Sequence, residues 1–119
     1  MHDKQNSIKI GKKAELLVEQ LLRQSGWKIL ESNYRNIGFE IDIIAQKNKT
    51  LIFVEVKFRR KAIEENILPQ RKKHALKRGA LHFIRYKNPS YETARIDLAI
   101  ISPSGGSNEA TLQYFTGVN

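Results

Sequence analysis

Two strand-like runs that flank a short polar turn, residues 39–46 and 50–58, constrain most strongly how this chain can fold. Apolar residues dominate both runs, yet Asp42 lies inside the first, and Glu55 and Lys57 lie inside the second. Carboxylates are rarely found within hydrophobic strands unless a cation meets them there. The pattern therefore predicts a β-hairpin whose strands carry a charged site.

The turn determines which residues of the hairpin face each other. With a two-residue loop at 48–49, the register places Asp42 opposite Glu55. It also places Glu40 opposite Lys57. Opposed Cβ atoms lie about 4.5–5.5 Å apart, and two ionised carboxylates that close repel by roughly 4 kcal/mol at an effective dielectric constant of about 20. Protonation of one acid, a neighbouring lysine or a divalent cation would relieve the repulsion, and we expect a Mg²⁺ or Mn²⁺ site beside Lys57.

The alternative is an ordinary amphipathic ribbon with one solvated face, on which Glu40 and Lys57 form a salt bridge. That face is not wholly polar, because Ile44 and Phe53 fall on it too, opposed in the same register. One end of the face is apolar and the other is charged, as at the mouth of a site. The pattern therefore favours a functional site over a solvated face.

The composition bounds the class of protein. A chain of 119 residues is enough for one modest domain and too short for two, so residues 1–119 are interpreted as a single domain. There is no cysteine, which excludes disulfides and thiolate metal sites. We see no signal-peptide pattern and no apolar run of membrane-spanning length. The expectation is a cytoplasmic protein without a membrane partner.

The charge is strongly one-sided, with 21 Lys and Arg against 12 Asp and Glu and a net charge of +9. This balance predicts attraction to a polyanion, first of all nucleic acid. A basic domain that associates with ribosomes or proteins is the alternative. The basic residues around the acids are the candidate nucleic-acid contacts: Arg35, Arg59, Arg60, Arg71, Lys72, Lys73 and Lys77.

Hydrophobic periodicity and turn residues predict two helices and five strands along the chain. Because strands and helices alternate in this order, we expect a mixed α/β sheet flanked by helices. The predicted helices are 7–25 and 69–87, and the predicted strands are 27–34, 39–46, 50–58, 93–102 and an edge strand at 109–115, with a loop at 61–68.

Three other acids fall on predicted elements. Glu15 lies beside the apolar stripe of the first helix and could reach the hairpin, but its residue pattern alone favours a solvated helix glutamate. Glu19, four residues further on, could share its face. Asp97 lies in the apolar strand 93–102, where it could cap, pair with Arg95 or lie near the site, and a structural role is favoured.

Five segments together resemble the PD-(D/E)xK nuclease superfamily and, within it, the YraN-type family related to archaeal Holliday-junction resolvases. The resemblance covers most of the chain. It lies in Gly-x-x-x-Glu at 11–15, Asn-Tyr-Arg at 33–35, the block 38–45, the Glu-x-Lys block 53–59 and the later strand segment 95–99. It implies a restriction-endonuclease-like αβββαβ core.

The resemblance also implies roles for individual residues. Asp42, Glu55 and Glu15 would form the acidic cluster that binds Mg²⁺ or Mn²⁺. Lys57 would orient or activate the attacking water or stabilise charge on the phosphate. Glu40 matches a family position without an assigned role.

The hypothesis from the sequence is a metal-dependent endonuclease that hydrolyses phosphodiester bonds of DNA, with branched or repair intermediates as candidate substrates. The rival is a non-catalytic nucleic-acid-binding module on the same scaffold. The sequence leaves the oligomeric state open, although a homodimer with two sites would suit a four-way junction.

Overall fold

The elements of the computed structural model follow the predicted order, and the structure describes residues 4–59, 68–103 and 110–119. The largest difference is that the first helix begins three residues earlier than predicted. The predicted loop at 61–68 falls, except for its last residue, outside the described residues. The elements are α1 (Lys4–Gln24), β1 (Lys28–Asn36), β2 (Phe39–Lys47), β3 (Thr50–Phe58), α2 (Gln70–Lys87), β4 (Thr93–Pro103) and β5 (Ala110–Phe115).

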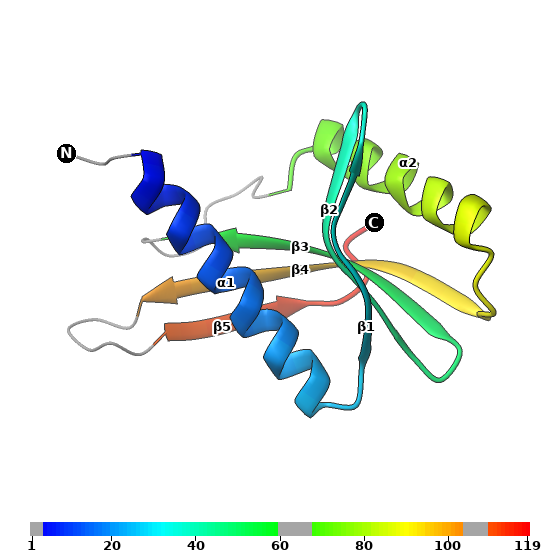
Figure 1. Ribbon diagram of the computed structural model, residues 1–119, viewed down its shortest axis with the longest axis horizontal. Helices are drawn as coiled ribbons and strands as arrows, with labels where there is room; N and C mark the ends of the chain where they lie inside the picture. Colours follow the sequence, from blue (N-terminus) through cyan, green and yellow to red (C-terminus); the bar gives the residue numbers. More distant parts are fainter. Residues whose placement is uncertain (1–3, 60–67, 104–109) are drawn as a thin grey trace.

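The five strands form one mixed sheet in the order β1-β2-β3-β4-β5. Only β3 and β4 run parallel, and the other neighbours are antiparallel. A parallel pair needs a crossover connection, which α2 supplies. Figure 1 shows α1 lying across β3, β4 and β5, and α2 beside β2. The expectation of a mixed sheet flanked by helices is confirmed.

Alternate residues of β3 serve two separate cores, one on each face of the sheet. Phe53 packs in one cluster with Leu76 and Phe83 of α2. Val54, its neighbour, packs in the other cluster with Val18 of α1. Because helices cover both faces, both sets of side chains must be apolar, which explains the nearly continuous hydrophobic run of this strand.

The β2–β3 hairpin turns at Asn48, whose φ of 55° lies in the left-handed region that short hairpin loops require. The register from Lys47↔Thr50 to Ile43↔Val54 is the predicted one.

The second helix has well-defined ends. Pro69 precedes it with φ −62°, and Asn88 follows it with φ 46° while its N–H donates to the Ile84 carbonyl. Neither α1 nor α2, as far as their residues are described, carries an apolar stretch that could cross a lipid bilayer.

Gly79 is the point at which α2 approaches β2 most tightly. A Cβ atom built there would lie 2.8 Å from both Ile41 Cδ1 and Phe39 Cδ1. Gly11, within α1, has no heavy atom within 4 Å of the same position. We therefore expect Gly79→Ala to have a free energy of unfolding about 1–3 kcal/mol below that of Gly11→Ala, the usual range for overpacking.

Both substitutions gain the same helix propensity, roughly 0.8–1 kcal/mol. The difference between their free energies of unfolding therefore reports the contact of position 79 with β2. Urea denaturation of the two variants measures it. Equal free energies of unfolding would show that the helix does not approach the strand this closely.

Candidate functional site

The two central strands part at one end of the hairpin. Their last paired residues at that end are Ile43↔Val54. Beyond this point β2 pairs only with β1, as far as Asn36↔Phe39, while β3 continues beside β4. Figure 1 shows β1 and β2 curving away from β3 here. The gap between the strands is where the predicted acids lie.

The parting of the strands corrects one prediction. The register was expected to continue to Glu40 opposite Lys57, but Glu40 is exposed and faces Arg35 of β1. The physical reason is the curvature of β2, which follows β1 rather than β3 in this segment.

Asp42 and Glu55 come together at the gap, as the hairpin register predicted. Their side chains are nearly buried, with exposures of 8% and 4%. Asp42 Oδ2 accepts a hydrogen bond from the Val56 N–H at 2.8 Å. The Asp42 carboxylate thus takes the place of a β2 backbone carbonyl, because the two strands no longer pair at this position. The Asp42 carboxyl lies close enough to the Glu55 carboxyl for the two to affect each other's charge.

This proximity changes the acidity of Asp42. Burial, and after it the negative charge of Glu55, raises the pKa of Asp42 from 3.8 to about 8. The Val56 N–H lowers the pKa in part, and the charge of Glu15 raises it further. A proton held between two buried carboxyls removes their repulsion. The pair therefore holds a proton at neutral pH when no cation is bound.

Two lysines form ion pairs with Glu55. Lys57 Nζ lies 3.5 Å from Glu55 Oε2, and Lys72 Nζ lies 3.4 Å from the same oxygen. Lys57 was predicted beside the acids, whereas Lys72 was expected only as a nucleic-acid contact. The first turn of α2 brings Lys72 to the site. No spacing rule links positions 55 and 72, so this contact could not be predicted from the residue pattern.

Glu15 reaches the site from α1 and is not the solvated glutamate that its residue pattern favoured. Its side chain is half-buried, and the Asn33 amide, with its nitrogen turned toward it, donates to Glu15 Oε1 at 3.1 Å. Burial raises the pKa of Glu15, while Lys12 lowers it and the charges of Glu40 and Glu19 raise it. Glu15 therefore adds to the negative field at Asp42.

Glu19 is buried and ties α1 to the sheet. Its Oε2 accepts a hydrogen bond from Ser32 Oγ at 2.9 Å, and its Oε1 lies 3.4 Å from Arg23 Nη2. Its carboxylate is thus engaged by the strand and by its own helix.

Asp97 is fully buried and has the structural role predicted for it. It accepts hydrogen bonds from Arg95 Nε at 3.0 Å, from Tyr114 O–H at 2.6 Å and from Gly117 N–H at 3.0 Å. These contacts join β4 to β5 and to the C-terminal segment. Burial, and after it the Asp97 carboxylate, raises the pKa of Tyr114.

The remaining candidate nucleic-acid contacts lie on several elements. Lys73 is half-buried on α2, and Arg60 lies outside the described residues. The exposed members are Arg35 of β1, Arg59 after β3, and Arg71 and Lys77 of α2.

The oxygen donors of Asp42 and Glu55 suit Mg²⁺ or Mn²⁺. Within residues 4–59, 68–103 and 110–119, no group of three or more His, Cys, Asp and Glu side chains is arranged to hold a metal ion. A Mg²⁺ site commonly uses one or two carboxylates and completes its shell with water and substrate phosphates. The donor set therefore fits an open two-carboxylate site, with Glu15 acting through its charge.

Comparison with known proteins places this site within a matched region. The sequence matches the uncharacterised protein family UPF0102 over residues 14–101. A UPF0102 protein of Kosmotoga olearia is 35% identical over 103 residues, which cover 86% of this chain and 90% of the relative. One of Dictyoglomus thermophilum is 38% identical over 105 residues, covering 84% and 89%. These names state a family and no activity.

The raised pKa of Asp42 makes the free energy of unfolding depend on pH. Because the pKa is about 8 in the folded protein against an ordinary 3.8, the folded state binds more protons between these values. The contribution of Asp42 to the free energy of unfolding is fully present below the ordinary pKa. It is lost as the pH rises through the pKa of the folded protein. Without divalent cations, the contribution falls with a slope approaching about 1.4 kcal/mol per pH unit.

Urea denaturation in a chelator at several pH values measures this slope. Asp42→Asn should remove it, and the difference between the two profiles isolates Asp42 from other titrating groups. Glu92→Gln, which changes an exposed acid, should keep the wild-type profile. Parallel profiles for wild type and Asp42→Asn would refute the raised pKa.

Proposed function

Within the uncharacterised protein family UPF0102, to which this chain belongs, we propose that the protein is a divalent-metal-dependent endonuclease that hydrolyses phosphodiester bonds of DNA. The observation that carries the proposal is the pair of buried carboxylates, Asp42 and Glu55, with two lysines 3.4–3.5 Å from one of them. Buried titratable groups with perturbed pKa values and specific charge partners cluster at functional sites.

The order of elements supports the proposal. The αβββαβ succession, followed by an edge strand, is the core that the resemblance to PD-(D/E)xK nucleases implies. The acids lie within β2 and β3, each next to the last pair that the two strands form, Ile43↔Val54, and Glu15 lies on the preceding helix. These are the positions that the resemblance assigns to the acidic cluster.

The chemistry would use these groups in distinct roles. A divalent cation held by Asp42 and Glu55 would polarise a phosphate oxygen and acidify the attacking water. Lys57 adds positive charge where the phosphate gains negative charge, and it could orient the water. Lys72 places a second ammonium on the same side of Glu55. Glu15 adds a smaller share of the negative charge that acts on Asp42.

A second candidate function is supported by a specific observation. Glu55 is already engaged by Lys57 and Lys72, and no third carboxylate of the described residues completes a metal-binding group. Such a neutralised cluster could serve a basic module that binds DNA without cutting it. The two functions differ in their response to divalent cations.

Metal binding should displace the proton of Asp42. In calorimetric titrations of Mn²⁺ at neutral pH, in buffers of different ionisation enthalpy, we expect release of about one proton per ion, since metal ligands must be deprotonated. Asp42→Asn and Glu55→Gln should weaken binding by more than about tenfold, because even loss of an outer-shell partner costs about 10–100-fold. Glu92→Gln should bind as wild type does.

If Mn²⁺ gives no heat of binding, or the same heat with Asp42→Asn as with wild type, the proposed metal site is wrong.

Lys57→Ala should lower the rate of DNA cleavage by about 10²–10³-fold, the usual effect of removing one charge-stabilising group. Its affinity for Mn²⁺ should change little. Branched, duplex and single-stranded DNA, each with Mg²⁺ or Mn²⁺, are the substrates, and nicked products are measured on denaturing gels. Lys28→Ala, which removes an exposed lysine of β1, is the control.

If no DNA is cut, and salt-sensitive binding ignores both metal and Asp42→Asn, the non-catalytic module is the correct function.

A further inference from the structure

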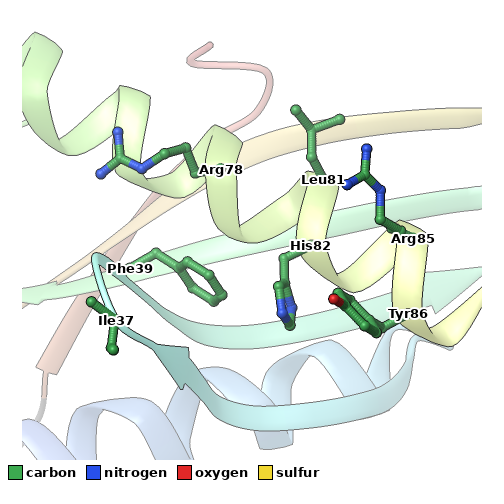
Figure 2. A pocket seen from close by; sticks show the side chains of 7 residues that line it. All are labelled: Ile37, Phe39, Arg78, Leu81, His82, Arg85 and Tyr86. Atoms are coloured by element: carbon green, nitrogen blue, oxygen red, sulfur yellow. The ribbon is translucent and has the colours of Figure 1, made fainter.

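A groove separate from the acidic site lies between the second half of α2 and the turn that joins β1 to β2. Its volume is about 390 Å³, within the range of small-molecule sites. Among the described residues that line it, none is acidic and two are arginines. The lining residues are Ile37, Phe39, Arg78, Leu81, His82, Arg85 and Tyr86 (Figure 2).

The aromatic rings of the groove form a row. Figure 2 shows Phe39, His82 and Tyr86 following one another between α2 and the β1–β2 turn. The His82 ring centroid lies 5.2 Å from that of Phe39 and 4.4 Å from that of Tyr86, whose plane is tilted by 33°. Tyr86 ends the row and is 69% exposed. The Tyr86 ring is therefore largely exposed to solvent at the end of a row of tilted rings in contact.

The row is held in place by hydrogen bonds. His82 Nδ1 lies 2.6 Å from the Tyr34 hydroxyl, and His82 Nε2 lies 3.5 Å from Asn36 Nδ2. Arg78 Nη2 donates to the Gly38 carbonyl at 2.9 Å. These contacts order the groove before any ligand arrives, which reduces the entropy lost on binding.

A ligand of this groove must cover its exposed apolar side chains and also carry negative charge to match its two arginines. Ile37 and Leu81 are 98% and 68% exposed beside Arg78 and Arg85. A polyanion that carries flat π faces matches both features, because bases stack on aromatic rings while cations hold the backbone. The net charge of +9 favours the same partner. Bases in a duplex are already stacked, so only unpaired bases can use the Tyr86 ring.

We propose that this groove binds a single-stranded segment of nucleic acid by stacking an unpaired base on Tyr86, with Arg85 and Arg78 beside its phosphates. The proposal rests on nucleic acid being the partner of the proposed function, and it adds the form of the substrate. The substrate is DNA with unpaired bases next to the site of cleavage, rather than a fully paired duplex.

The test compares one fluorescent oligonucleotide as an unstructured single strand and as a blunt-ended duplex with its full complement, at fixed salt with chelator. Tyr86→Ala should weaken single-strand binding by about 5- to 150-fold, the range for one stacked base, and duplex binding by less than about twofold. Tyr86→Phe should retain the affinity. Tyr91→Ala, which removes an exposed tyrosine outside the groove, is the matched control. Circular dichroism and urea denaturation check that each variant is folded.

A 2-aminopurine base in the strand reports stacking directly. Its fluorescence should be quenched by wild type and Tyr86→Phe but not by Tyr86→Ala. Equal losses for strand and duplex, or no loss in Tyr86→Ala, would overturn the proposal. So would sedimentation showing that Tyr86→Ala breaks a dimer, because the groove would then bind a second copy of the chain.

The outcomes separate this proposal from the proposed function. Quenching without metal, but no cleavage with Mg²⁺ or Mn²⁺, would keep the groove and reject the endonuclease. Cleavage that depends on Asp42, with normal strand binding by Tyr86→Ala, would keep the endonuclease and reject the groove. No binding in chelator would reject the groove, and neither binding nor cleavage with Mg²⁺ or Mn²⁺ would reject both.

Discussion

The placement of two carboxylates in a nearly dry gap between β2 and β3 is the constraint on which the site depends. Asp42 and Glu55 repel each other when both are ionised, and burial makes this repulsion stronger. The chain offsets it with the Val56 N–H, a retained proton and the ammonium groups of Lys57 and Lys72. An apolar pair would stabilise the strands more simply, and this supports the proposal of a cation site here.

The fold brings charge to this gap from both faces of the sheet. α1 supplies Glu15, and the first turn of α2 supplies Lys72. The same α2 carries Tyr86 fourteen residues further on, about 21 Å along a helix axis. One helix therefore links the acidic site to the aromatic groove. A nucleic acid that lies along α2 could contact both.

Much of the fold was predictable because its signals are local. The two-residue turn at 48–49 sets the hairpin register as far as Ile43↔Val54, and the Asp42 and Glu55 side chains interact one position beyond this last pair. The extension of the register to Glu40 failed because the curvature of β2 depends on its pairing with β1, which no local pattern encodes.

Contacts between distant elements were not predictable. Lys72 was counted among phosphate contacts because its position on a basic helix gives no indication of Glu55. The groove could not be predicted either, because its rings come from two elements that are distant in the sequence. The contact of Phe39 with His82 forms only when α2 packs on β2. The hydrogen bond that joins the His82 ring to Tyr34 likewise links residues 48 positions apart.

The most direct measurement is the titration of the Asp42 carboxyl carbon by NMR, with and without Mg²⁺. The account predicts a pKa of about 8 in chelator. Addition of Mg²⁺ should lower that pKa by at least about one unit, because the cation favours the ionised form. An Asp42 that titrates near its ordinary value, or whose titration Mg²⁺ leaves unchanged, would contradict the account.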